Sequence, residues 1–239
     1  MRRILFLIIF IFCAFIKLYS QDFDTRMITS SIGLSNSSVT CILQDSEGQM
    51  WFGTWDGLNM YDGKSITVFK PEPGNDESIS NNIIREMIEQ KPGILWIATD
   101  RGINRLDIKT GKSERFFFGN SGWDIPTEHA FIISKDSKEN IFAFIYGQGA
   151  FVFNDNTRIF EHVSMPGTNG AVKAIHGKDN NLYILNKDNL LQKVKLSSDE
   201  RGKICVSESV ELVTDATNIF LYGIVIRMVC FPIWKTIPL

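Results

Sequence analysis

Cysteine is scarce in this chain of 239 residues, and its four cysteines form no recognisable pattern. Outside the first twenty residues they are Cys41, Cys205 and Cys230, an odd number without a close pair. This spacing excludes a disulfide framework and a structural zinc site. We interpret Cys41, which lies inside an apolar run, as a buried free thiol.

An excess of charge of one sign is also missing. The formal net charge is −2, and acidic and basic residues are scattered without a long like-charge run. Proteins that bind nucleic acid carry a basic patch or stripe. We therefore expect no nucleic-acid partner.

Catalytic and cofactor motifs are absent as well. The histidines His129, His162 and His176 are 33 and 14 residues apart, which is no known ligand spacing. There is no Gly-x-Ser-x-Gly elbow, and no pair of carboxylates stands out from the other acidic residues. The segment 63–65 reads Gly-Lys-Ser but lacks the preceding spacing of a phosphate loop. We expect no enzyme activity, no cofactor and no metal site.

What the chain does have is a repeat. Residues 48–59 return as residues 93–104, which is 45 residues later, with five identical positions: Gly48/Gly93, Trp51/Trp96, Thr54/Thr99, Gly57/Gly102 and Asn59/Asn104. Weaker copies follow at 136–153 and at 179–194, where Tyr183 takes the aromatic position and Asn189 that of the turn glycine. A period of roughly 20 to 50 residues indicates units that stack on one another to bury their apolar faces.

Each unit predicts four short strands joined by tight turns. In the first unit these are residues 39–43, 50–54, 58–61 and 66–69, with Asp-Gly at 56–57 and 62–63. Asp-Gly between apolar runs is a strong hairpin signal, and four such strands make a propeller blade. No apolar helical period runs through these glycines, so a helical solenoid fits poorly.

The predicted fold is therefore all-β, a partial β-propeller over 21–223 whose blades, about four in number and four-stranded, form an open arc. We place the blades at 34–72, 80–118, 128–163 and 170–196, with a remnant of a further blade at 204–223.

Both ends of the chain differ from the repeats. Residues 1–20 begin with two arginines and continue with an apolar stretch at 4–16, a secretory signal pattern with expected cleavage after Ser20. The stretch is shorter than the ~20 residues of a spanning helix, and an uncleaved anchor is the alternative. We expect export to the periplasm and no other membrane span. The segment 224–239 carries Arg227 and Pro232 within its apolar run, and we interpret it as a truncated or out-of-frame tail.

The candidate binding residues lie in loops at one face of the blades. In a propeller, the turn between the second and third strands shares a face with the link to the next blade. The residues that flank this turn are the same in the two copies, whereas the residues at its tip differ. Such variation is expected for a binding surface carried on the loops of a constant scaffold. Tryptophan beside aspartate and arginine suits the recognition of sugars. Packing of Trp55 against the next blade is the alternative. The candidate ligand-binding residues are Trp55, Asp56, Asp100, Arg101, Trp123 and Gln148.

The segments "SVTCILQDSEGQMWFGTWDGLNMYDG" and "GILWIATDRGINRLD", together with Gly-Leu-Ser-Asn at 33–36, resemble two-component regulator propeller repeats. The resemblance covers about residues 22–195 and is strongest over 34–118. Such repeats build the periplasmic sensor region of bacterial hybrid two-component systems, so the resemblance implies carbohydrate sensing and an oligosaccharide ligand. The family's sensors have more blades, and nothing here resembles their kinase, receiver or DNA-binding regions. We therefore interpret the chain as a propeller fragment without output modules.

An open arc has a physical consequence. A propeller protects its strand edges by closing into a ring, and 27–32 is the segment expected to act as a closing strand. Without a partner blade we expect exposed apolar edges and self-association, which a cooperative monomeric melt without dye-accessible apolar surface would contradict. An adaptor that binds another protein is the alternative function. A propeller lyase or glycosidase is a third, and the absence of an acid/base pair argues against it.

Overall fold

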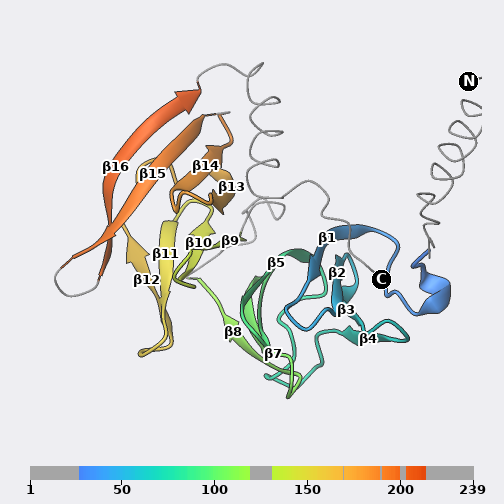
Figure 1. Ribbon diagram of the computed structural model, residues 1–239. Helices are drawn as coiled ribbons and strands as arrows, with labels where there is room; N and C mark the ends of the chain where they lie inside the picture. Colours follow the sequence, from blue (N-terminus) through green and yellow to red (C-terminus); the bar gives the residue numbers. More distant parts are fainter. Residues whose placement is uncertain (1–26, 119–130, 169, 189, 200–202, 214–239) are drawn as a thin grey trace, which may run out of the picture.

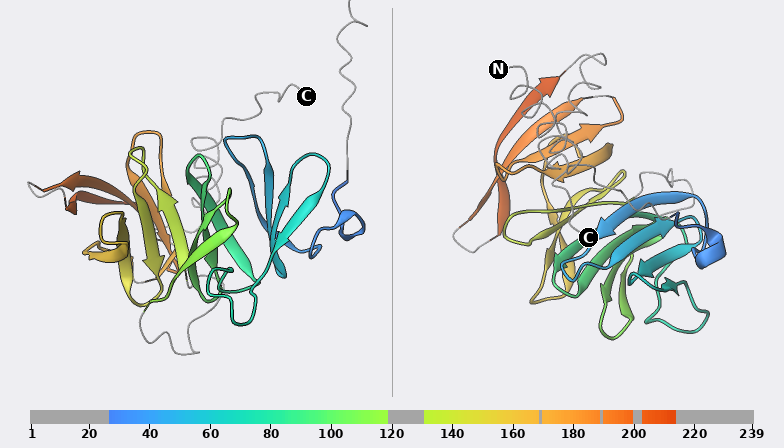
Figure 2. Two further views of the ribbon diagram at one scale, coloured as in Figure 1. Left: turned by 90° about the horizontal axis from the view of Figure 1, so that it is seen from below. Right: turned by 45° about the vertical axis from the view of Figure 1, so that its right-hand side comes forward.

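The computed structural model describes residues 27–118, 131–168, 170–188, 190–199 and 203–213. This part of the chain forms sixteen β-strands in four antiparallel sheets of four strands, and each sheet pairs its strands in chain order. We call these sheets blades 1 to 4. They stand side by side in an open arc (Figure 1, Figure 2). The predicted all-β partial propeller is confirmed.

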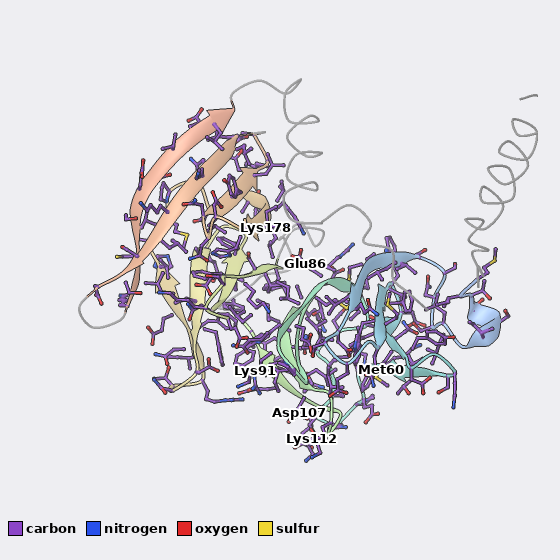
Figure 3. All side chains as sticks on the ribbon, viewed as in Figure 1. Met60, Glu86, Lys91, Asp107, Lys112 and Lys178 are labelled. Carbon is purple, nitrogen blue, oxygen red and sulfur yellow. The ribbon has the colours of Figure 1, made fainter. Side chains whose placement is uncertain are left out.

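The first two blades follow the 45-residue repeat. Blade 1 contains β1 (Val39–Gln44), β2 (Met50–Thr54), β3 (Gly57–Tyr61) and β4 (Ile66–Phe69). Blade 2 contains β5 (Ile84–Lys91), β6 (Ile94–Thr99), β7 (Gly102–Asp107) and β8 (Lys112–Phe116). Glu86, on β5, lies at the inner side of the arc, whereas Asp107 and Lys112 lie at the far tip of blade 2 (Figure 3).

The last two blades keep the same topology with a weaker sequence signal. Blade 3 contains β9 (Phe131–Lys135), β10 (Ile141–Ile145), β11 (Gly149–Asn154) and β12 (Ile159–Val163). Blade 4 contains β13 (Ala171–His176), β14 (Leu182–Asn186), β15 (Leu191–Ser198) and β16 (Ile204–Val213).

Two details differ from the sequence-based predictions. The segment 204–213 is not the remnant of a further blade, because it pairs with β15 from Leu191↔Val213 to Ser198↔Ile204 as the outer strand of blade 4. The proposed closing strand at 27–32 is also wrong. It contains the 3-10 turn η2 (Ser30–Ile32), since local bonds such as Ile32 N–H to Thr29 O satisfy its backbone.

Several predictions fall outside the described residues. They are the signal segment 1–20, Trp123, His129, Cys230 and the tail 224–239. None of the described segments forms a helix with the length and hydropathy needed to cross a membrane.

Apolar side chains fill the three spaces between neighbouring blades. On the middle strand β6, Leu95 and Ile97 belong to the cluster shared with blade 1, whereas Trp96 and Ala98 belong to the cluster shared with blade 3. The alternation of side chains along a strand thus buries both faces of β6, which explains its continuous apolar sequence. A third cluster, which includes Phe142 and Leu182, joins blades 3 and 4.

The two repeated tryptophans occupy equivalent positions in neighbouring blades. Trp51 and Trp96 are fully buried, and each indole Nε1–H donates to the side chain six residues earlier: to Asp45 Oδ2 at 2.8 Å and to Gln90 Oε1 at 2.9 Å. Each indole also packs on a phenylalanine near the end of the outer strand, with centroid distances of 5.7 Å to Phe69 and 5.5 Å to Phe116. The identity at this position therefore reflects one repeated core contact.

The face of blade 1 that points away from blade 2 carries a row of three apolar residues and one buried asparagine. The strand register places Ile42, Phe52, Asn59 and Val68 side by side across this face. Ile42 is 60% exposed, and Val68 is exposed as well. Self-association through this open face stays a prediction.

The interface between blades 3 and 4 contains His176, a histidine whose pKa is lowered by burial. Burial lowers the pKa of His176 from 6.5 to about 4, although the nearby charge of Asp136 acts in the opposite direction. His176 Nδ1 lies 2.8 Å from Ser134 Oγ, and its ring lies 4.9 Å from that of Phe142. The folded protein therefore holds the neutral imidazole at pH 5 to 6, whereas the unfolded chain is already binding protons there.

Because the unfolded state binds more protons between pH 6.5 and about 4, stability should fall as the pH drops through this window. Full titration of this one group corresponds to roughly 1–3 kcal/mol. We expect His176→Gln to flatten this part of the profile, measured by urea unfolding at several pH values. Equal slopes for the wild type and the variant would contradict the assignment.

Candidate functional site

A repeated chain of hydrogen bonds builds the turns that carry the predicted binding residues. In blade 1, Asn59 Nδ2–H donates to Ser35 Oγ at 2.8 Å, Ser35 Oγ lies 2.9 Å from Thr54 Oγ1, and Thr54 Oγ1–H donates to Gly57 O at 2.9 Å. Blade 2 repeats this chain with its equivalent residues at 2.9, 3.1 and 3.0 Å: Asn104, Ser80, Thr99 and Gly102. We call each set a clasp.

The clasps hold the segment that enters each blade against the β2–β3 or β6–β7 turn. Backbone N–H groups of Ser35 and Ser80 donate to the carboxamides of Asn59 and Asn104, both at 2.8 Å. The two asparagines are completely buried, so each must keep its partners inside the protein. The repeated threonine and asparagine are therefore structural, and they fix the frame on which the variable turn residues stand.

The turn in each of these two blades requires glycine at one position. Gly57 and Gly102 have φ values of +127° and +139°. A Cβ atom would lie 2.9 Å from Phe69 O at Gly57 and 2.6 Å from Phe116 O at Gly102. Only glycine fits both the backbone conformation and the close approach of the outer strand.

Two predicted residues from different blades meet through a third residue. Trp55, in the β2–β3 turn, is 52% exposed. The guanidinium of Arg85, on β5, lies 5.8 Å from the centre of the Trp55 ring, within the range of a cation–π contact. Arg85 Nε and Nη2 also donate to the two carboxylate oxygens of Asp100, at 2.5 and 3.1 Å. Trp55, Arg85 and Asp100 therefore form one group, which we call the mouth triad.

The mouth triad combines an open aromatic face with a shielded ion pair. The side chains of Arg85 and Asp100 are only 18% and 10% exposed. A bidentate arginine–carboxylate pair is geometrically rigid, and low exposure limits its screening by water and salt. This arrangement can present a flat stacking surface next to fixed hydrogen-bonding groups.

The Asp56 side chain, by contrast, binds the link between blades 1 and 2. Its carboxylate lies 2.6 Å from Lys70 Nζ and 3.3 Å from Asn82 Nδ2, and these hydrogen bonds, that of Lys70 first, lower the pKa of Asp56. Lys70 and Asn82 lie at the two ends of the link between blades 1 and 2. Asp56 thus borders the mouth triad and ties the link to the β2–β3 turn.

The remaining candidates lie apart from this group or make separate contacts. Arg101 is exposed beside Asp100, and its backbone N–H donates to Thr99 Oγ1 at 3.2 Å. Gln148, in blade 3, donates from Nε2 to Phe118 O at 3.3 Å, a contact with the segment that leaves β8. Trp123 lies outside the described residues, and all six candidates stay predictions as ligand-binding residues.

Residues 73–82 belong to the link between blades 1 and 2, and much of this segment covers the outer edge of blade 2. Arg115 donates from Nε to Ser78 O and from Nη2 to Asn75 O, both at 2.7 Å. Ser113 N–H donates to Glu77 O at 2.6 Å, which extends the edge of β8 by one backbone bond. The link therefore protects an edge strand, and only its last residues reach the loop face.

Sequence reasoning missed Arg85, Asn82 and Lys70, because nothing in the repeat marks them. It also missed an ion pair on the inner side of the arc. Glu86, on β5, contacts Lys173, on β13, and accepts a bond from the backbone N–H of Ile133, on β9, at 3.3 Å. This group joins the inner strands of three blades.

Cys41 adds no reactive centre here. Cys41, on β1, is a free thiol whose pKa is raised to about 11, chiefly by burial. The thiolate is the reactive form, so burial keeps Cys41 inert near neutral pH. Among the described residues, no three His, Cys, Asp or Glu side chains gather in a way that could hold a metal ion.

Comparison with known proteins connects the repeat to a family. The family described as two component regulator propeller matches residues 33–56. A histidine kinase named P4 from Formosa agariphila is 42% identical over 74 residues, which are 30% of this chain and 5% of that protein. The chain thus spans a small part of the curated relative that it matches.

Two solved structures share the fold. The extracellular domain of a putative hybrid two component system from B. thetaiotaomicron has a TM-score of 0.57 and 21% identity, over 81% of this chain and 31% of that one. A catalytically inactive virginiamycin B lyase from Staphylococcus aureus, solved with quinupristin, has a TM-score of 0.55 and 16% identity, over 76% and 59% of the two chains. At such identities the likeness concerns the fold alone.

The family match begins two residues before the clasp residue Ser35 and ends in the β2–β3 turn, so it includes Ser35 and Thr54 of the blade 1 clasp. Residues 33–56 are therefore similar to a two-component regulator propeller repeat, and blade 2 repeats the same contact with Ser80 and Thr99.

Proposed function

We propose that this chain is part of the extracytoplasmic ligand-binding propeller of a two-component sensor, and that it binds an oligosaccharide at the mouth triad. The observation that carries the proposal is Trp55. It is a large aromatic residue that is 52% exposed on a turn whose frame is otherwise buried and repeated. An exposed indole next to fixed polar groups is suited to stack on the apolar face of a sugar ring.

Three further observations support this proposal. The residues after Thr54 and Thr99 differ between the blades, Trp-Asp in one and Asp-Arg in the next, while the clasps beneath them are the same. A rigid scaffold with variable turns is the usual arrangement for a binding surface. The fold is also that of an extracellular domain of a hybrid two component system, and export to the periplasm fits such a role.

A binding role also fits the chemistry of the acidic residues. Asp56 and Asp100 are both in ion pairs, with Lys70 and Arg85, and the paired Asp56 has a lowered pKa. A general acid needs a carboxyl group whose pKa is raised toward the working pH. The lowered pKa of Asp56 does not suit that role, and the Asp100 carboxylate is bound to Arg85 by both oxygens, so we propose recognition rather than catalysis here.

Replacing Trp55 with alanine should weaken oligosaccharide binding at least about tenfold, because the stacking surface is lost. Trp55→Phe should retain part of the affinity, since it keeps an aromatic face. Isothermal titration calorimetry with malto-, cello- and xylo-oligosaccharides and with oligogalacturonates measures the effect.

The matched control is Tyr61→Ala. Tyr61 lies at the opposite end of blade 1, where its hydroxyl donates to Gly63 O at 2.8 Å. This variant should bind as the wild type does. If no oligosaccharide binds the wild-type chain, or if Trp55→Ala binds equally well, the proposed function fails.

A further inference from the structure

Three of the four inner strands, those of blades 1, 2 and 4, share an irregularity that the sequence repeat does not reveal. The register of β1 shifts between Val39 and Cys41, that of β5 between Ile84 and Glu86, and that of β13 between Ala171 and Lys173. Each shift leaves one extra residue: Thr40, Arg85 and Val172, respectively. All three lie opposite the end of the second strand of their blade, next to its turn to the third strand.

A β-bulge bends its strand and re-aims the extra side chain. The Thr40 hydroxyl donates to Gly53 O at 3.0 Å and to Ile84 O at 2.7 Å. It therefore joins the inner strand of blade 1 to that of blade 2. At Arg85 the side chain instead reaches Asp100 and Trp55 at the loop face. The bulge therefore recurs in three blades while its side chain differs, and in blade 2 it places an arginine at the loop face.

The guanidinium of Arg85 has two usable edges. Asp100 occupies the edge formed by Nε and Nη2. The second edge, formed by Nη1 and the other Nη2 hydrogen, has no hydrogen-bond partner among the described residues. Two parallel N–H groups held in a rigid plane suit a pair of neighbouring acceptor oxygens.

The charges around this edge favour a neutral ligand. Arg85 is already paired with Asp100, and Lys70 with Asp56. A ligand carboxylate or sulfate on the second edge of Arg85 would lie close to the Asp100 carboxylate and be repelled by it. Neighbouring hydroxyl oxygens of a neutral sugar meet no such repulsion.

We propose that Arg85 is a positioning and specificity-determining residue: it holds the Trp55 indole in place and donates its second edge to neighbouring hydroxyls of a neutral oligosaccharide. The ligand part of this proposal rests on the function proposed above. The positioning part concerns the free protein and is tested without a ligand.

The first test is fluorine NMR of the chain labelled with fluorotryptophan, in which Trp55→Phe assigns one resonance among the five tryptophans. Arg85→Ala and Asp100→Asn should both shift and broaden the Trp55 resonance, because they remove the guanidinium or its anchor. The control is Arg158→Ala, which breaks another arginine–carboxylate contact between blades, with Glu114. It should leave that resonance in place. A Trp55 resonance that is unchanged in Arg85→Ala would overturn the positioning role.

The second test is titration with neutral oligosaccharides and with oligogalacturonates of equal length. Arg85→Ala should lose about tenfold or more in affinity for the neutral ligand, and Arg85→Lys should recover only part of it, since an ammonium lacks the planar pair of donors. Arg158→Ala should bind normally. Full rescue by lysine, or a wild-type preference for oligogalacturonates, would overturn the specificity role. Absence of all saccharide binding would refute the ligand part along with the proposed function, and the NMR result would still decide the positioning role.

Discussion

Replacing Trp96 with alanine should lower the free energy of unfolding by about 3–5 kcal/mol, the range for removing a large aromatic side chain from a core. Trp96 is fully buried and packs on Phe116, Phe153 and Phe160, with centroid distances of 5.5, 4.7 and 5.6 Å. Two of these rings belong to blade 3, so the substitution opens a cavity between blades. Urea unfolding followed by far-ultraviolet circular dichroism measures the loss.

Alanine substitutions at two other tryptophans, one buried and one exposed, serve as comparisons. Trp51→Ala should be strongly destabilising as well, because Trp51 holds the equivalent position between blades 1 and 2. Trp55→Ala should change stability by no more than about 0.5 kcal/mol, as is usual for an exposed side chain. A small effect at Trp96, or a large one at Trp55, would show that the two types of tryptophan have been assigned the wrong roles.

Replacing Asn104 with leucine should cost about 2–4 kcal/mol, although the two side chains are similar in size. The loss leaves the backbone N–H of Ser80 without its acceptor in a part-buried site, and it removes one of the two hydrogen bonds of the Ser80 hydroxyl. The clasp also holds the segment whose Ile83 O accepts the backbone N–H of Asp100 at 3.3 Å. We therefore expect Asn104→Leu to weaken ligand binding at the mouth triad in addition to lowering stability.

A double-mutant cycle of Asn104→Ala and Ser80→Ala, measured by urea unfolding, should give a coupling energy of about 1 kcal/mol or more, because the two side chains act as one unit. Asn156→Ala, in an exposed turn of blade 3, is the matched control and should be nearly neutral. Additive effects of the two clasp substitutions would contradict the hydrogen-bond chain.

The fold could be predicted because its determinants are local and repeated. Trp51 and Trp96 are 45 residues apart, and turn glycines such as Gly57 and Gly102 separate the strands of their units. The break before β16 misled the sequence reasoning, although Asp199 N–H donates to Lys203 O at 2.9 Å between the end of β15 and the start of β16. A polar segment within one blade resembles a boundary between blades when only the sequence is read.

The sequence shows clasp residues as identities between the repeats, but it does not show that they contact one another. Comparison of the repeats identifies the pairs Asn59/Asn104 and Thr54/Thr99. Their partners Ser35 and Ser80 are also 45 residues apart. Recognising this third pair would have indicated a structural role for the whole set.

Arg85 could not be found in this way. It is the extra residue of a bulge, and a bulge depends on how the neighbouring strand pairs rather than on residue type. Its partners Trp55 and Asp100 lie in the turns of two different blades, so the mouth triad exists only once those blades are packed together.

The most direct test of the account is the deuterium exchange of the indole N–H groups, followed by NMR in the absence and presence of a neutral oligosaccharide. The indole N–H groups of Trp51 and Trp96 should exchange slowly and stay unshifted by ligand, because both are buried and bonded to Asp45 and Gln90. That of Trp55 should exchange rapidly and shift on binding. Rapid exchange at Trp51 or Trp96, or a bound saccharide that leaves Trp55 unshifted, would contradict a propeller whose repeats form the core and whose turns bind the ligand.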